Sequence, residues 1–217
     1  MKIRLAHLYG NLLNTYGDVG NIMALRYHLR KKGYEVETDL ISLGDKFDNK
    51  KYDFVFFGGG QDYEQSIVEI DLFKKRDYLK EYIESDGLFL SICGGFQLLG
   101  DYYSTMDGKK IDGLKIFKHY TINPKGSKRF ISNVKIESTD SKEIYYGFEN
   151  HGGRTYLSKD QVPFGKVIEG NGNNGEDKTE GFVYKNTYGT YLHGPLLARN
   201  ENLCDNFVKI IEKKLIK

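Results

Sequence analysis

Several residue types are scarce in this sequence of 217 residues. It has two cysteines, Cys93 and Cys204, no tryptophan and three prolines. Two cysteines cannot build the disulfide framework of a small secreted domain, and the chain opens without a charged and then apolar leader. No pair of histidines or cysteines has the spacing of zinc ligands. These absences predict a cytoplasmic protein that needs no metal of its own.

Long apolar runs and a surplus of one charge are missing as well. The most apolar stretch, residues 87–100, is 14 residues long, whereas a membrane-spanning helix needs about 20. The 32 lysines and arginines nearly balance 30 acidic residues, which leaves a formal net charge of +2. Proteins that grip phosphate backbones carry a basic surplus. We therefore expect neither direct insertion into a membrane nor a nucleic-acid partner.

Apolar residues are abundant enough for a large core. They make up 39% of the chain and include 13 phenylalanines and 17 tyrosines. The length fits one domain, residues 1–217, and no repeat of 20 to 50 residues is present. Glycine is the unusual residue, because the chain has 25 of them against a usual share of about 7%.

The first half of the chain alternates between strand and helix patterns. We expect strands at residues 3–8, 35–40, 53–57 and 88–92, and helices at residues 21–32 and 64–85. The last two strands are almost wholly apolar, which is typical of strands buried on both faces of a parallel sheet. This order predicts an α/β fold with a doubly wound, mostly parallel sheet flanked by helices.

The second half is richer in strand patterns and closes with a helix. We expect additional antiparallel strands at residues 115–122, 130–136, 143–148 and 181–192, the last interrupted by a turn at 185–189. Residues 199–217 have the apolar spacing of an amphipathic helix, on which Cys204 is a small buried residue. Residues 169–181 are polar and free of proline, and their composition alone predicts a flexible surface loop.

Cys93 is the strongest candidate for a reactive residue. It directly follows the expected strand 88–92 and precedes Gly94, Gly95 and a short helical segment. A nucleophile at such a tight strand-to-helix turn is exposed at the carboxyl edge of the sheet, and the start of a helix favours the thiolate. The amide of Gly94 would face an oxyanion formed beside Cys93. This context predicts a cysteine nucleophile.

A second oxyanion donor and a base are also needed. Gly58–Gly60 follow the neighbouring buried strand and supply close backbone, but no Gly-Lys-Ser/Thr follows them, so the loop is no phosphate cradle. Among the five histidines, His151 and His193 both lie at the ends of strand patterns beside glycine. The residue pattern does not choose between these two as the base of Cys93.

Three motifs together resemble the class I glutamine amidotransferases of the cobyric-acid-synthase-like branch. They are Phe57–Asp62, Ile92–Gly100 and Gly189–Leu196, in the order of that family. The resemblance implies a flavodoxin-like fold and a glutaminase that releases ammonia from L-glutamine. It assigns Cys93 as nucleophile and His193 as general acid and base, with oxyanion donors at Gly94 and Gly59.

The resemblance also assigns the substrate site and a partner. It implies that Arg129 pairs with the α-carboxylate of glutamine and that Gln97 and Gly60 help to hold the substrate. The stretches 7–21, 147–155 and 172–181 resemble, more narrowly, the members of this branch that supply ammonia for the amidation of lipid II. These act as heterodimers with a MurT-like Mur-ligase subunit, which binds ATP and Mg²⁺ and the lipid-linked substrate. The match of 172–181 favours an ordered functional loop over a flexible one. The resemblance implies that this loop lies at the interface with the partner.

One departure from the family concerns the acid that orients the histidine. Many class I members carry a carboxylate two residues after the histidine, where this chain has Pro195. Glu149 is one candidate for the third member of the triad. The other is an acid donated by the partner subunit, which would restrain wasteful hydrolysis of glutamine by the free chain.

Other functions are compatible with the same residues. The glutaminase could serve another acceptor, such as a cobyrinate-type substrate. A cysteine hydrolase on the same fold would act alone and would not need free glutamine. A catalytically silent binding subunit is disfavoured by the presence of both Cys93 and His193. If the heterodimer forms, the protein would lie at the inner face of the membrane through its partner.

Overall fold

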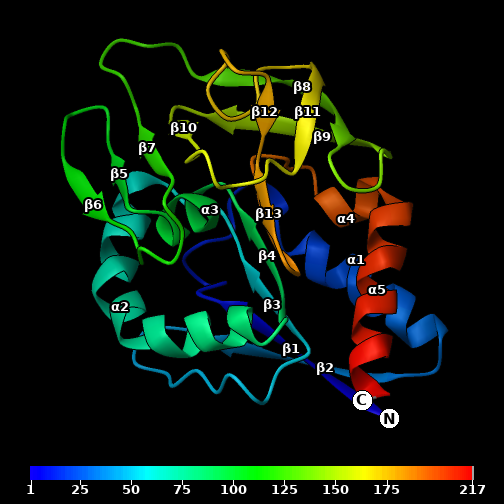
Figure 1. Ribbon diagram of the computed structural model, residues 1–217. Coiled ribbons are helices and arrows are strands. Elements are labelled where there is room, and N and C mark those ends of the chain that lie inside the picture. Colours follow the sequence, from blue (N-terminus) through cyan, green and yellow to red (C-terminus); the bar gives the residue numbers. More distant parts are fainter. Residues whose placement is uncertain (217) are drawn as a thin grey trace.

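The computed structural model describes residues 1–216 and contains a central sheet of six strands (Figure 1). Their order is β13-β14-β4-β3-β1-β2. The bounds are β1 (Lys2–Leu8), β2 (Glu35–Ile41), β3 (Phe54–Phe57), β4 (Leu88–Ile92), β13 (Phe182–Tyr184) and β14 (Thr187–Thr190). All neighbours are parallel except β13, which pairs antiparallel with β14. The predicted α/β fold with a mostly parallel sheet is confirmed.

Helices cover both faces of this sheet. Figure 1 shows α2 (Asp62–Glu84) on one face, and α1 (Gly20–Lys31) and α5 (Glu201–Leu215) together on the other. α5 buries Leu203, Phe207 and Ile211, which are spaced so that one stripe of the helix faces the sheet. Two short helices, α3 (Gly94–Leu99) and α4 (Leu196–Arg199), follow β4 and β14. No helix within residues 1–216 combines the length and apolar composition that a membrane crossing requires.

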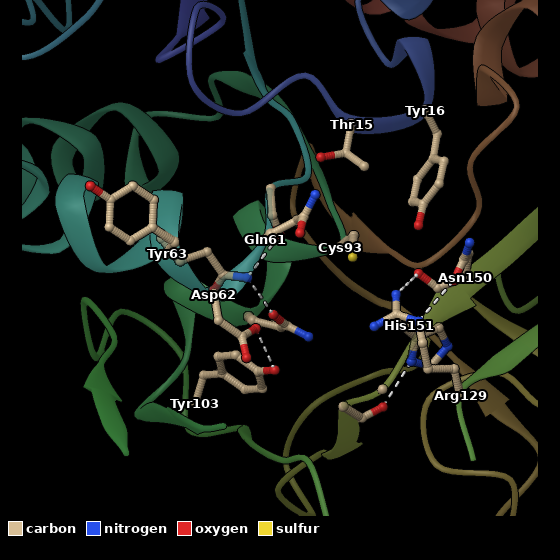
Figure 2. Close-up of a pocket in the computed structure, with 15 residues that line it drawn as sticks. Thr15, Tyr16, Gln61, Asp62, Tyr63, Cys93, Tyr103, Arg129, Asn150 and His151 are labelled. Carbon is tan, nitrogen blue, oxygen red and sulfur yellow. Dashed lines mark hydrogen bonds between the residues drawn. The ribbon is translucent and has the colours of Figure 1, made fainter. Parts of the chain in front are cut away.

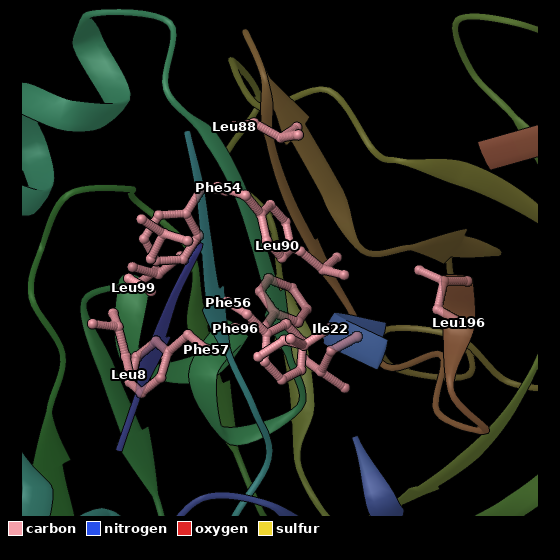
Figure 3. Packing of buried hydrophobic residues seen from close by; sticks show 14 of the residues in the cluster. Leu8, Ile22, Phe54, Phe56, Phe57, Leu88, Leu90, Phe96, Leu99 and Leu196 are labelled. Atoms are coloured by element: carbon pink, nitrogen blue, oxygen red, sulfur yellow. The ribbon is translucent and has the colours of Figure 1, made fainter. Parts of the chain in front are cut away.

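The core lies between the sheet and its helices (Figure 3). Phe54, Phe56 and Phe57 on β3 and Leu90 on β4 are fully buried, as the continuous apolar runs predict. Phe96 on α3 is fully buried as well. The turn after β4, which carries Cys93, is thus attached to the buried core.

The second half of the chain forms two smaller four-stranded sheets above the carboxyl ends of the parallel strands (Figure 1). One has the order β10-β7-β5-β6 and the other the order β12-β11-β8-β9. The bounds are β5 (Tyr102–Ser104), β6 (Lys110–Asp112), β7 (Tyr120–Ile122), β8 (Phe130–Ser138), β9 (Ile144–His151), β10 (Arg154–Tyr156), β11 (Gly165–Glu169) and β12 (Thr179–Glu180). All pairs in them are antiparallel except β5 with β7. The additional antiparallel strands are confirmed.

Several predicted boundaries in this half differ from the structure, and two of the differences have a clear cause. The strand expected at 115–122 is reduced to β7, because the backbone N–H groups of Lys115 and Phe117 donate to the end of α3 and not to a neighbouring strand. The turn expected at 185–189 is shorter, and Gly189 belongs to β14. A Cβ atom on Gly189 would lie 2.3 Å from the ring of Phe182, so this strand position requires glycine.

Candidate active site

Cys93 lies at the sharp turn between β4 and α3, as predicted. Its backbone has φ +51° and ψ −106°, a conformation that is unfavourable for any residue but glycine. The turn is held by close packing, because a Cβ on Gly95 would lie 2.5 Å from the carbonyl oxygen of Phe57. Cys93 is 9% exposed and faces a pocket above the sheet. The fold therefore holds the sulfur at the pocket floor in a strained turn that the surrounding core supports.

His193 follows β14 and is held from two sides. Its backbone exchanges hydrogen bonds with Phe148 on β9, at 2.8 and 3.0 Å. Its Nδ1 lies 2.9 Å from Oδ1 of Asp18, and both side chains are fully buried. Its Nε2 has no hydrogen-bond partner within residues 1–216. The ring is thus oriented by Asp18 and leaves its second nitrogen free for chemistry.

Gly59 brings the three residues together. Its amide donates to Oδ2 of Asp18 at 3.2 Å. A Cβ on Gly59 would lie 3.2 Å from Cβ of Cys93 and 3.3 Å from Cε1 of His193. Cys93 and His193 therefore both pack against this glycine, and any larger residue would crowd them.

Asp18 determines the charge of His193. Burial disfavours the imidazolium, but the interactions with Asp18 and Cys93 outweigh this cost and raise the pKa of His193 to about 10. The histidine is therefore protonated at neutral pH in the resting site. An imidazolium beside a cysteine favours the thiolate, which is the nucleophilic form.

The structure corrects the prediction for the third member of the triad. Glu149 lies on β9, and its carboxylate accepts hydrogen bonds from Asn171, Gly172 and Ser132. The histidine beside it is His151, at 3.8 Å, and not His193. An acid from a partner is not needed either, because Asp18 of the same chain already occupies Nδ1 of His193. Asp18 lies within the stretch 7–21 that carries the family resemblance, but its distance of 175 residues from His193 concealed the contact.

One of the two predicted oxyanion donors makes another hydrogen bond in this structure. Gly59 was the expected second donor, but its amide is used to hold Asp18. Gly60 lines the pocket, and its amide nitrogen lies 3.1 Å from the position of a Cβ on Gly94. The amide nitrogen of Gly60 therefore lies close to Gly94 beside Cys93, which makes Gly60 a further candidate donor for an oxyanion.

The pocket above Cys93 has a volume of about 370 Å³. Figure 2 shows Asp62, Tyr63 and Tyr103 on one side of it, Arg129, Asn150 and His151 on the other, and Cys93 between them. Polar side chains of both charges thus converge on a space large enough for an amino acid. Residues 1–216 contain no cluster of three or more His, Cys, Asp or Glu side chains that could hold a metal ion.

Arg129 lies in the wall of the pocket, where the sequence resemblance placed it. Its Nε and Nη2 donate to the side-chain and backbone oxygens of Asn150, at 3.0 and 2.9 Å. Within residues 1–216, Nη1 makes no such bond and is available for a carboxylate. Buried Arg154 fixes the preceding backbone by donating to the carbonyl of Lys128 and stacking on Phe130. No residue pattern around Arg154 predicts this supporting role.

His151 and Gln97 are both buried beside the pocket. His151 stacks on Tyr191 with 3.6 Å between ring centroids, and its Nδ1 donates to the carbonyl of Gly153. Burial lowers the pKa of His151 despite the nearby Glu149, so the ring is neutral. The side-chain amide of Gln97 bonds to Tyr191 and Gln65. Of the two candidate bases left open by the sequence pattern, His193 packs with Cys93 against Gly59 and pairs with Asp18, whereas His151 lies in the pocket wall.

Residues 169–181 form a packed loop and not a flexible one. Buried Asn173 and Asn174 bond within the loop and to neighbouring strands. The carboxylate of Glu149 accepts hydrogen bonds from the backbone N–H groups of Asn171 and Gly172, both at 2.9 Å. Glu149 is therefore the anchor of this loop. That the loop contacts a partner stays a prediction.

Replacement of this anchor should destabilise the protein. We expect Glu149→Ala to lower the free energy of unfolding by about 2–5 kcal/mol, because the donors on Ser132, Asn171 and Gly172 lose their acceptor at once. Glu137→Ala, at an exposed position of β8, is the matched control and should change it by less than about 0.5 kcal/mol. Urea unfolding of both variants measures this. Equal stability of the two variants would refute the anchoring role.

Glu180 is a buried acid at the other end of the loop. It accepts hydrogen bonds from the hydroxyl of Thr190 and the amide of Tyr191, and so holds the strand that leads to His193. Burial raises the pKa of Glu180 to about 8, although these hydrogen bonds partly offset the effect. The folded protein therefore keeps this side chain protonated at pH values where the unfolded chain ionises.

Because the pKa of Glu180 differs between the folded and unfolded chains, the stability of Glu180→Gln should depend on pH differently from that of the wild type. Because the folded pKa is raised, stability from the protonated acid is complete below the unfolded pKa of 4.5 and is lost as the pH rises towards 8. The amide cannot ionise, so the variant should gain stability relative to the wild type by at most roughly 1.4 kcal/mol per pH unit in this window. Urea unfolding at pH 5, 6.5 and 8 tests it. If the free energies of unfolding of the variant and the wild type changed with pH in the same way, the prediction would be contradicted.

Comparisons with known proteins agree with this geometry. Residues 4–201 match the CobB/CobQ-like glutamine amidotransferase domain. The chain is 54% identical to the lipid II isoglutaminyl synthase (glutamine-hydrolyzing) subunit GatD of Streptococcus pneumoniae, over 98% of this chain and 82% of the relative. It is 42% identical to the GatD subunit of Staphylococcus aureus, over 98% and 86% of the two chains.

A solved structure shows the same fold at greater distance. The chain resembles a chain of the PurLQS structure from Thermotoga maritima with a TM-score of 0.67 and 17% identity, over 99% of this chain and 100% of that one. The resemblance found in the motifs is confirmed by the family match and by both relatives. This chain belongs to the CobB/CobQ-like glutamine amidotransferase family and, within it, to the group that contains the GatD subunits.

Proposed function

We propose that this chain is the glutaminase subunit of a lipid II isoglutaminyl synthase. It hydrolyses L-glutamine to glutamate and ammonia, and the ammonia is used by a partner subunit. The observation that carries the proposal is the arrangement at Cys93, where His193 is oriented by buried Asp18 and keeps Nε2 free. Near-full-length identity of 54% to a GatD subunit supports the choice of acceptor.

The first chemical step is attack of the Cys93 thiolate on the side-chain amide carbon of glutamine. His193 is an imidazolium because Asp18 stabilises its charge, and it protonates the leaving nitrogen. The negative charge that forms on the amide oxygen is stabilised by the N–H groups of Gly60 and Gly94. Collapse of this intermediate releases ammonia and leaves a thioester between the substrate and Cys93.

The second step is hydrolysis of the thioester. His193 has given its proton to ammonia and can now accept one from water, which attacks the thioester carbon. Asp18 stabilises the imidazolium as it forms again and holds Nδ1 in the correct tautomer. Arg129 holds the α-carboxylate of the substrate during both steps. Glutamate then leaves the pocket.

The proposed partner is a MurT-like Mur-ligase subunit in a heterodimer. It would use ATP and Mg²⁺ to activate the α-carboxylate of D-glutamate in the stem peptide of lipid II, and ammonia from this chain would convert it to D-isoglutamine. The naming of both relatives as subunits supports a partner. Such a complex would work in the cytoplasm, at the inner face of the membrane where the partner meets its lipid-linked substrate.

Labelling with a glutamine-like electrophile tests the proposed role of Cys93. We expect 6-diazo-5-oxo-L-norleucine to form one adduct on Cys93, found by peptide mass spectrometry, and excess L-glutamine to protect against it. Cys204 is the internal control because it is buried on α5, away from the pocket. No adduct on Cys93, with or without the partner subunit, would favour another function for the site.

A further inference from the structure

Gln65 is a buried polar residue that the sequence did not single out. It lies on α2, is 2% exposed and lines the pocket together with Cys93. Its Nε2 lies 2.9 Å from the position of a Cβ on Gly94, the residue after the nucleophile. Gln65 therefore lies directly beside the reactive centre, although the mechanism above does not use it.

Hydrogen bonds fix which end of the Gln65 amide is free. Nε2 donates to the carbonyl oxygen of Gly60 and to Oε1 of Gln97, both at 3.1 Å. A carbonyl can only accept, so the nitrogen must point to Gly60, and both of its protons are used. Gln97 is held in turn by Tyr191, to whose hydroxyl it donates at 3.0 Å. The orientation of Gln65 is thus determined by the network behind it.

The oxygen of Gln65 has no partner in the part of the chain that the structure describes. A buried acceptor without a donor costs about 1–3 kcal/mol, so such atoms are rare in folded proteins. In a residue that lines a pocket, such an acceptor is a candidate contact for a donor group of the ligand.

Glutamine offers two groups that can donate to this oxygen. One is the side-chain amide, but its oxygen belongs between Gly60 and Gly94, and its nitrogen must reach His193. The other is the α-ammonium group. Asp62 lies three residues before Gln65, on the same face of α2, and also lines the pocket. Its Oδ1 accepts from Tyr103 at 2.8 Å, which fixes the carboxylate in the pocket wall.

We propose that Gln65 and Asp62 together bind the α-ammonium group of glutamine, opposite Arg129. The amide oxygen of Gln65 would accept a hydrogen bond from the ammonium group in a fixed orientation, and the carboxylate of Asp62 would neutralise its charge. Arg129, on the facing wall of the pocket, would bind the α-carboxylate (Figure 2). Gln65 is then a specificity residue that restricts the glutaminase to α-amino acids. The inference rests on the proposed glutaminase function and adds the basis of its substrate selection.

The test compares L-glutamine with glutaric acid monoamide, which has the same amide and carboxylate but no α-ammonium group. Both are assayed with the chain in complex with its partner subunit. Gln65→Met should raise KM for L-glutamine by roughly 10- to 100-fold and leave kcat/KM for the monoamide nearly unchanged. The wild-type preference for L-glutamine should shrink by the same factor. A merely structural role would reduce both activities alike.

Two further variants keep the inference falsifiable. Gln161→Met makes the same chemical change outside the pocket and should leave the preference intact. Asp62→Asn, at an exposed position, should reduce the preference several-fold even if Gln65→Met does not fold. An unchanged preference in Gln65→Met or in Asp62→Asn, while Cys93→Ala is inactive, would overturn the inference and leave the glutaminase function standing. Full activity of Cys93→Ala would overturn the function itself.

Discussion

Cys93→Ala should abolish glutamine-dependent amidation by the complex, with a loss of at least about 10³-fold. The variant lacks the only sulfur at the pocket, and no other nucleophile in the described residues lies in the strained turn after β4. Activity with added ammonium salt should remain near the wild-type level, because the partner can take ammonia from solution. Product formation is measured with glutamine and with ammonium chloride as alternative nitrogen donors.

The control for this result is Cys204→Ala. Cys204 is fully buried on α5 and does not line the pocket, so the variant loses some packing but no reactive group. It should keep glutamine-dependent activity. Retention of that activity in Cys93→Ala, or loss of the ammonium-dependent reaction together with it, would contradict the proposed division of labour between the two subunits.

Asp18→Asn should lower kcat for glutamine hydrolysis by roughly 10²- to 10⁴-fold. The amide removes the negative charge beside Nδ1 of His193 and allows the wrong tautomer of the ring. It also removes the main interaction that raises the pKa of His193 against the effect of burial. The basic limb of the pH–rate profile should therefore move from near pH 10 to lower pH. Steady-state rates between pH 6 and 10.5 measure both effects.

A second aspartate–histidine pair supplies the matched control. Asp205 lies 2.9 Å from Nδ1 of His28, and this pair is on the surface. Asp205→Asn makes the same chemical change and should leave the rate and the pH profile unaltered. If Asp18→Asn behaved like Asp205→Asn, the acid that orients His193 would have to come from elsewhere, and the partner subunit would again be the candidate.

The sequence predicted those parts of the site that depend on residues close together in the chain. An apolar strand followed by Cys93, Gly94 and Gly95 is enough to identify the nucleophile turn, because close packing behind β3 requires small residues there. The alternation of strands and helices in the first half likewise predicted a mostly parallel sheet flanked by helices, although not the order of its strands. Both features depend on residues that are near each other in the chain.

The parts that the sequence missed depend on contacts between distant segments. Asp18 reaches His193 across 175 positions, and a pattern of glycine and polar residues around Asp18 does not distinguish a buried acid from a turn residue. Glu149 was a candidate because Pro195 stands where the family carries a carboxylate, but its side chain accepts hydrogen bonds from the 169–181 loop instead. Short strands such as β5, β6 and β10 were missed because three residues are too few to establish an alternating pattern.

Transfer of labelled nitrogen tests the central claim most directly. The complex of this chain with its partner subunit is supplied with L-[amide-¹⁵N]glutamine, unlabelled ammonium chloride, ATP, Mg²⁺ and lipid II, and the product is examined by mass spectrometry. The account predicts ¹⁵N in the new carboxamide of the stem peptide, one label per glutamate released, and only unlabelled nitrogen when Cys93→Ala is used. Product that carries no ¹⁵N with the wild-type chain would contradict it.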